Sequence, residues 1–145
     1  MRHVQTEIVI DAQAKQVWDI LTDFASFPLW NPFLRRVAGE PKPGAKLRLR
    51  VRMPGVLLLP MRTTVIKVEP LCYFSFIGRF PIPGIISGEH SWEIVALGNG
   101  RVRLTHREIF RGLLVPMGFW LVRRIVTRGF EWMDLALKDR AEKPE

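Results

Sequence analysis

The stretch LVPMGFWLVRRIVTRGFEWMDLALK, residues 114–138, decides how the rest of the chain can fold. Its apolar side chains recur at steps of three and four, which predicts an amphipathic helix that begins near Pro116. The apolar stripe comprises Val115, Phe119, Val122, Val126, Phe130, Met133 and Leu137. The opposite arc carries Arg123, Arg124, Thr127, Arg128, Glu131, Asp134 and Lys138. An apolar face this broad favours a helix that covers a sheet or a cavity over the narrower seam of a coiled coil.

The bulk composition fits a single domain over residues 1–145. A chain of this length can bury a core without disulfides, and the single cysteine, Cys72, excludes an internal one. No apolar run approaches ~20 residues and the N-terminus lacks a signal-peptide core, so a cytoplasmic protein is expected. The net charge of +8 indicates attraction to anionic surfaces or ligands, but it identifies no partner.

The remaining chain predicts short helices and strands. Residues 14–23 favour a short helix, and FASFPLWNP (24–32) favours a broken second one followed by a turn. Alternation with period two predicts strands near residues 4–10, 33–39, 46–53, 61–69, 72–80, 87–97 and 101–111. The strands from residue 33 onward leave no room for crossover helices, so we expect an antiparallel sheet. The predicted fold class is α+β, with seven strands, two short helices after the first strand and the long C-terminal helix.

Three apolar loops are expected at one end of this meander, because alternate turns of an antiparallel sheet lie at opposite ends. They are PGVLLLP (54–60), FPIPGII (80–86) and GLLVPMGFW (112–120). Loops are normally polar, so these predict a pocket entrance, a membrane contact or a dimer interface. The side chains expected at a pocket mouth are Leu57, Leu58, Ile85 and Trp120. A basic collar flanks the loops, formed by Arg52, Arg62, Arg79 and Arg111.

Two neighbouring strands are predicted to point polar side chains inward. Alternation places His90 beside Trp92 on one strand, and His106 and Glu108 beside Phe110 on the next. A buried carboxylate is costly unless it is paired or protonated. Three interpretations stay open: a satisfied structural network, the polar end of an apolar pocket, or acid–base catalysis. No metal site is expected, because no further ligands are evident.

The order of elements, together with VWDILTDFASFPLWNPFLRRVAG, GEHSWEI, RLTHREIFRGLLVP and FEWMDLALKDR, resembles the bacterial SRPBCC proteins. This START-like superfamily includes polyketide cyclase-like proteins and the birch-pollen allergen. The resemblance covers nearly the whole chain, and WNPF, GEH and T-x-x-E-x-F-x-G-L are its most specific parts. It implies the helix-grip fold, with a hydrophobic cavity between a curved sheet and the C-terminal helix. It also implies that Trp30, Asn31 and Phe33 lie near the cavity mouth, with His90 and Glu108 inside.

The resulting functional prediction is binding, extending to transport, of a hydrophobic small molecule or lipid in that cavity. The predicted lining comprises Trp30, Asn31, Phe33, Phe76, His90, Trp92, His106, Glu108, Phe110, Phe119, Val122, Val126, Phe130 and Met133. One alternative is a polyketide cyclase-like or dehydratase-like enzyme, with Glu108, His90 and His106 as candidate proton carriers. Another is a membrane-surface or protein interaction module that uses the apolar loops. We expect no cofactor and no nucleic-acid partner, at most weak contact with anionic membranes, and either a monomer or a homodimer.

Overall fold

The computed structural model describes residues 2–55, 58–79 and 84–143. As predicted, two short helices follow the first strand and one long helix ends the fold. They are α1 (Ala14–Thr22), α2 (Phe27–Trp30) and α3 (Phe119–Glu142), with a 3-10 turn η1 (Phe24–Ser26) before α2. The strands are β1 (Arg2–Ile10), β2 (Leu34–Ala38), β3 (Lys46–Arg52), β4 (Leu58–Glu69), β5 (Tyr73–Arg79), β6 (Ser87–Gly98) and β7 (Arg101–Arg111).

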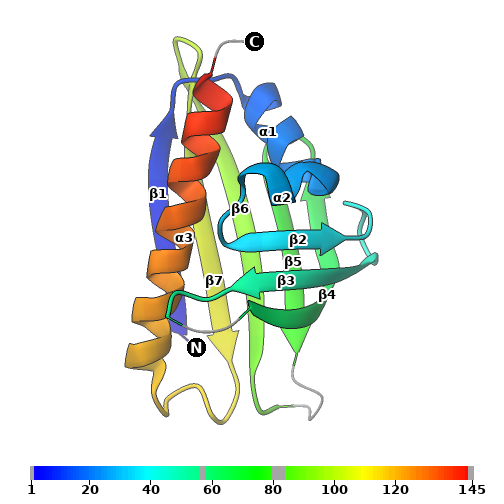
Figure 1. Cartoon of the computed structure of the whole chain (residues 1–145), viewed down its shortest axis with the longest axis vertical. Helices are drawn as coiled ribbons and strands as arrows, with labels where there is room; N and C mark the ends of the chain where they lie inside the picture. Colours follow the sequence, from blue (N-terminus) through cyan, green and yellow to red (C-terminus); the bar gives the residue numbers. More distant parts are fainter. Residues whose placement is uncertain (1, 56–57, 80–83, 144–145) are drawn as a thin grey trace.

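All seven strands form one antiparallel sheet in the order β1-β7-β6-β5-β4-β3-β2. In Figure 1, β5, β6 and β7 run along the long axis of the molecule, β2 and β3 run across it, and α3 lies beside β1. The register shifts between β2 and β3, between β4 and β5, and between β6 and β7. Such irregularities bend strands and raise the local twist, which helps the sheet to curl. The predicted helix-grip fold is therefore confirmed.

The alternation that predicted the strands is clearest in β3. Its inward residues Leu47, Leu49 and Val51 are buried, whereas the basic residues between them are exposed. Burying a large aliphatic side chain stabilises the fold by about 1.5–3 kcal/mol, so this pattern fixes which face of the strand meets the core. The same inner face continues through β4 to β7, where it carries the candidate site.

The short helices close one end of the fold, at the top of Figure 1. The ring of Phe24 packs edge-on against Phe74 of β5, with centroids 6.0 Å apart. Asn31, which ends α2, is fully buried, and its side-chain oxygen accepts hydrogen bonds from the backbone N–H groups of Phe33 and Leu34 at 3.0 and 2.9 Å. This part of the chain therefore organises the entry into β2.

Several boundaries differ from the sequence prediction, and the largest shifts are at the start of β4 and at both ends of α3, which continues to Glu142 beyond the predicted end at residue 138. Helix α3 begins at Phe119 and not near Pro116, because Gly118 adopts a left-handed conformation with φ of 80° and ends a tight turn. Strand β4 begins at Leu58 and not at residue 61, because residues 58–60 pair with β3 and so belong to the sheet.

Two of the three predicted apolar connections lie together in the structure. The backbone N–H groups of Leu113 and Leu114 donate hydrogen bonds to the carbonyl oxygens of Gly84 and Ile85, at 3.0 and 3.2 Å. Residues 84–86 and 112–114 are therefore side by side. No helix in the described ranges combines the length and the apolar character needed to cross a membrane.

Candidate functional site

A cavity of about 600 Å³ lies inside the curl of the sheet. Its walls come from Phe33 and from the inner faces of β2 to β7, and most of the lining side chains are apolar. Five residues of the predicted lining contribute to it: Phe33, Phe76, His90, Glu108 and Phe110. Its rim includes the exposed side chains of Arg62 and Arg79.

The space arises where two glycines face each other across neighbouring strands. Gly78 of β5 pairs directly with Gly88 of β6, and the row continues to Thr63 on one side and Phe110 on the other. Both glycines line the cavity. The two missing side chains leave room on this face of the sheet, which the side chains of Thr63 and Glu108 partly fill beside the hollow.

Gly88 also makes room for the carboxylate at the polar end of the cavity. A Cβ atom at this position would lie 2.8 Å from Oε2 of Glu108. Glu108 therefore lies over the glycine, and its side chain is 19% exposed. The strand alternation that turns Glu108 inward and the absence of a side chain at Gly88 together bring the carboxylate to the cavity wall.

Behind Glu108, a polar chain runs through the core to α3. Oε1 of Glu108 lies 3.1 Å from Nδ1 of His90, and Nε2 of His90 lies 2.6 Å from Nε2 of His106. Nδ1 of His106 then lies 2.8 Å from Oδ1 of Asp134. The chain ends where the Thr6 hydroxyl on β1 donates a hydrogen bond to Oδ2 of Asp134 at 2.5 Å. We call these five residues the polar chain.

The three contacts between Glu108 and Asp134 hold one hydrogen each when all of them are satisfied. In one arrangement Glu108 is protonated, both histidines are neutral and Asp134 is a carboxylate. In the second arrangement each hydrogen has crossed its contact, so that Glu108 is the carboxylate and Asp134 is protonated. Both arrangements carry one negative charge, and moving the three hydrogens moves that charge between the cavity wall and α3.

The electrostatics of His90 favour its neutral form. Burial lowers the pKa of His90 below its ordinary value of 6.5, and the adjacent His106 lowers this pKa further. The hydrogen bond with Glu108 opposes these effects and raises the pKa of His90. A neutral imidazole can donate at one nitrogen and accept at the other, as transfer along the polar chain requires.

Aromatic rings fix the orientation of both histidines. The His90 ring stacks on Phe76 with centroids 4.8 Å apart, and the His106 ring stacks on Phe130 at 3.7 Å. Trp92 packs against both imidazoles at 5.2 and 5.9 Å. Because these neighbours are buried, neither imidazole can rotate without disturbing the core.

One cavity side chain lacks a hydrogen-bond partner. The hydroxyl of Thr63 is buried and has no partner among the residues that the structure describes, although Thr63 lines the cavity. Leaving a buried hydroxyl unpaired costs about 1–3 kcal/mol. The polar residues of the wall are therefore Thr63, His90 and Glu108, with Arg62 and Arg79 at the rim, and the other lining residues are apolar.

Much of the predicted lining lies elsewhere. The residues outside the cavity wall are Trp30, Asn31, Trp92, His106, Phe119, Val122, Val126, Phe130 and Met133. Within the described ranges α3 contributes nothing to this wall, because Phe130 stacks on His106 and the ring of Phe33 presses against Gly129. These contacts fill the space between the helix and the sheet, and they move the cavity toward β3 and β4.

The remaining helix positions differ in their surroundings. Phe119 packs edge-on against Phe110, with centroids 5.8 Å apart, so it supports the wall from behind. Val122 is 39% exposed, which contradicts its predicted inward position. Helix α3 packs mainly against the edge strand β1, and the sheet ends before it can cover this side of the first turns. Val126 and Met133 are core residues with 2% and 0% exposure.

The predicted mouth also needs correction. Leu57 lies outside the described residues. Leu58 pairs with Arg52 within the sheet, and it is Leu59 that lines the cavity. Ile85 is half-buried and does not line the cavity, whereas the next residue, Ile86, does. Trp120 is 65% exposed on the outer side of α3, so it borders a surface groove and not the cavity.

The sequence interpretation missed the acid at the far end of the polar chain. The helical pattern predicts Asp134 on the solvent-facing arc of the helix, but Asp134 is 3% exposed and hydrogen-bonded to His106 and Thr6. A usable signal was its neighbourhood, because Phe130 and Met133 on the same helix are fully buried. The described residues contain no group of three or more His, Cys, Asp or Glu side chains arranged to hold a metal ion.

Comparison with known proteins identifies the family. The family model described as polyketide cyclase / dehydrase and lipid transport matches residues 1–142. The chain belongs to this family. No curated protein matches the sequence.

Solved structures of other proteins share the fold of this chain. A START superfamily protein from Mycobacterium smegmatis aligns with a TM-score of 0.78 at 23% identity, covering 97% of each chain. An aromatase/cyclase from Streptomyces sp. R1128 aligns with a TM-score of 0.76 at 20% identity, over 97% of this chain and 93% of the other. A hypothetical protein from Helicobacter pylori aligns with a TM-score of 0.81 at 14% identity, over 97% and 88%. At these identities the structures establish the fold alone.

Proposed function

We propose that this protein binds one hydrophobic small molecule or lipid in the cavity between β2 and β7. The observation that carries the proposal is the hollow above the Gly78–Gly88 pair, with its volume of about 600 Å³. Ligand sites typically enclose about 300–1,000 Å³ and combine apolar walls with a few polar groups. The family description, which includes lipid transport, agrees with this role.

The wall chemistry defines the class of ligand. The apolar side chains around the hollow favour a molecule with an aliphatic or aromatic body. Oε1 of Glu108 contacts His90, and the other carboxyl oxygen can accept a hydrogen bond, so the wall favours a ligand that carries a hydroxyl group on one side. A pure hydrocarbon would offer this oxygen no donor and should bind less tightly.

A cavity-filling variant tests binding. The neutral fluorescent probe N-phenyl-1-naphthylamine should bind the wild-type protein at one saturable site. Gly78→Val adds a side chain to the wall of the hollow at a residue with an ordinary strand conformation, where its Cβ atom would lie 3.3 Å from Cγ2 of Thr63, and it should weaken probe binding at least tenfold. Thr64→Val is the matched control, because Thr64 is the neighbour of Thr63 on the opposite side of β4. Equal probe affinity in Gly78→Val and wild type would reject the cavity as the site.

The polar chain supports a second candidate function, acid–base catalysis of the cyclase or dehydratase type. In the elimination of water from a β-hydroxy ketone, the carboxylate of Glu108 would take a proton from the carbon next to the carbonyl. The electron pair forms the new double bond, and the hydroxyl leaves with a returned proton as water, so no net proton is consumed. His90 would donate a hydrogen bond to Oε1 of Glu108 both before and after the other carboxyl oxygen takes the substrate proton, so the contact would stabilise Glu108 in both protonation states.

A simple substrate separates the two functions. The apolar β-hydroxy ketone 4-hydroxy-4-phenylbutan-2-one gives a conjugated enone on loss of water, which ultraviolet absorbance follows. If catalysis occurs, the wild type accelerates this reaction and Glu108→Gln loses the acceleration while still binding N-phenyl-1-naphthylamine. A wild-type protein that binds the ketone without accelerating its dehydration would leave binding as the function.

A further inference from the structure

The start of α3 and the turn before it form an exposed apolar surface. The exposed fractions are 77% for Leu113, 74% for Met117, 65% for Trp120 and 49% for Leu121. We call residues 113–122 the α3 tip. Contiguous apolar exposure on this scale is uncommon on soluble domains and marks a surface that contacts an apolar partner.

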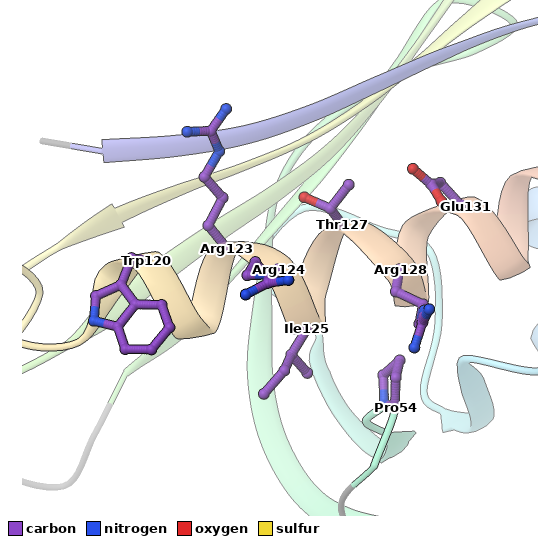
Figure 2. Close-up of a pocket in the computed structure, with 8 residues that line it drawn as sticks. All are labelled: Pro54, Trp120, Arg123, Arg124, Ile125, Thr127, Arg128 and Glu131. Atoms are coloured by element: carbon purple, nitrogen blue, oxygen red, sulfur yellow. The ribbon is translucent and has the colours of Figure 1, made fainter.

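Basic side chains follow directly behind the α3 tip. Arg123, Arg124 and Arg128 are all exposed, and none of them makes an ion pair with any residue that the structure describes. They border a surface groove of about 810 Å³ together with Trp120, and Glu131 is the single carboxylate lining it among the described residues. Figure 2 shows Arg123 and Arg128 extending to different sides of the helix, with Trp120 nearer its start.

This order along the helix, an apolar end followed by arginines on several sides, matches the layers of a membrane surface. Apolar side chains of interfacial helices enter about 5–10 Å into the boundary between headgroups and acyl chains. Tryptophan favours that boundary, and arginine favours the anionic phosphates above it. At about 1.5 Å rise per residue, the guanidinium groups lie within roughly two turns of the α3 tip.

Charge also argues against a second copy as the partner. Pairing two α3 tips would bring both sets of arginines together, and like charges repel at close range. Two copies that each carry a net charge of +8 repel each other, whereas an anionic bilayer attracts a protein of this charge. The surface is therefore complementary to anionic lipid.

The α3 tip is also joined to the cavity rim. Leu113 and Leu114 are hydrogen-bonded to Gly84 and Ile85, and the next residue, Ile86, lines the cavity. Gly112 permits this close approach, because a Cβ atom there would collide with the Ile85 carbonyl oxygen. A bilayer that contacts the α3 tip would therefore lie near the rim.

We propose that the α3 tip docks the protein on an anionic phospholipid bilayer, with Trp120 and Leu121 in the interface and the three arginines at the phosphates. The docking itself stands on the exposed surface alone. Its use for loading the cavity with a lipid rests on the proposed ligand binding.

Vesicle co-sedimentation tests the docking. The full chain should sediment with vesicles of phosphatidylcholine mixed with phosphatidylglycerol, should sediment far less with phosphatidylcholine alone, and should lose binding as salt is added. Arg123→Glu with Arg124→Glu should weaken binding by about thirtyfold or more, from the contribution of each basic residue near an anionic surface. The matched control, Arg48→Glu with Arg50→Glu, makes the same charge change on the outward face of β3 and should retain most of the binding.

The apolar part needs its own comparison. Trp120→Ala should reduce vesicle binding several-fold, whereas Trp132→Ala, further along α3 and 37% exposed, should not. Circular dichroism should show all of these surface variants folded. Equal binding to neutral and anionic vesicles would overturn the proposal, and so would equal losses in the test and control arginine pairs.

Two further measurements distinguish bilayer docking from dimer formation and from ligand binding. The docking would be overturned if the wild-type protein did not bind vesicles but formed a dimer, and if Trp120→Ala converted that dimer to a monomer. This result would make the α3 tip a homodimer interface. A protein that fails to bind vesicles but still binds N-phenyl-1-naphthylamine would reject the docking while leaving the cavity function intact. Vesicle binding without probe binding would reject the cavity function alone.

Discussion

Replacing Gly129 with alanine should destabilise the protein, although alanine is the better helix former. Gly129 is buried in the middle of α3, and a Cβ atom there would lie 2.5 Å from Cδ1 and Cε1 of Phe33, well inside the 3.4 Å at which ordinary contact begins. Phe33 is 3% exposed and packs edge-on against Phe130 with centroids 5.7 Å apart, so its ring has little room to move. Helix propensity favours alanine by ~1 kcal/mol, whereas overpacking costs ~1–3 kcal/mol. We therefore expect Gly129→Ala to lower the free energy of unfolding by up to about 2 kcal/mol.

A double-mutant cycle isolates this contact. Phe33→Ala alone should cost ~3–5 kcal/mol as a large-to-small change in the core. Once the ring is absent, adding Gly129→Ala should raise the free energy of unfolding, by up to ~1 kcal/mol, because only the helix propensity remains. Urea unfolding followed by circular dichroism measures all four proteins, with the m-values checked for equality. If Gly129→Ala stabilises the protein equally in both backgrounds, the ring of Phe33 does not lie against the helix.

Three further predictions concern the polar groups of the site. Thr63→Val should raise the free energy of unfolding of the ligand-free protein by ~1 kcal/mol in urea unfolding, because it removes an unpaired buried hydroxyl, and a loss would show that the hydroxyl is satisfied. Asp134→Asn should lower that free energy by ~1–3 kcal/mol through its two weakened hydrogen bonds, with His106 and Thr6, whereas the exposed Asp139→Asn on the same helix should stay within ~0.5 kcal/mol. Burial lowers the pKa of His90 in the folded state below 6.5, so on acidification the unfolded chain binds this proton before the folded protein does. The contribution of His90 to the free energy of unfolding is therefore complete above about pH 6.5 and is lost as the pH falls below it. Below about pH 6.5, the free energy of unfolding of the wild type, measured in urea, should fall by up to ~1.4 kcal/mol per pH unit more than that of His90→Gln. His3→Gln, at an exposed position, should show the same pH dependence as the wild type.

The sheet and the inward position of the site histidines could be predicted because alternation along a strand is a local property. Once His90 shares a face with Trp92, its side chain must point into the core, whatever the neighbouring strands do. The contact between His90 and Glu108 then needed only the hairpin register, and these residues are direct partners across β6 and β7. Both facts were available from the pattern and the short turn.

The position of the cavity could not be predicted in the same way. It depends on Gly78 and Gly88 meeting across two strands, and therefore on the register between β5 and β6. It also depends on Phe33 pressing against Gly129, a contact between residues far apart in the sequence. Asp134 shows the related limit for helices, because a helical wheel gives the direction of a side chain but not how far the sheet extends to cover it.

The composition of the polar chain argues for a role at the cavity wall. A buried network of two carboxylates and two histidines is often less stabilising than apolar residues of the same volume would be, so core packing alone does not explain it. Its continuity provides a better reason, because it connects Glu108 at the wall to Asp134 on α3 and to Thr6 on β1. Where no proton enters or leaves the polar chain, a ligand that favours one protonation state of Glu108 moves the negative charge toward or away from Asp134, which contacts Thr6 on β1. Four hydrogen bonds therefore connect the cavity wall to the contact between α3 and β1.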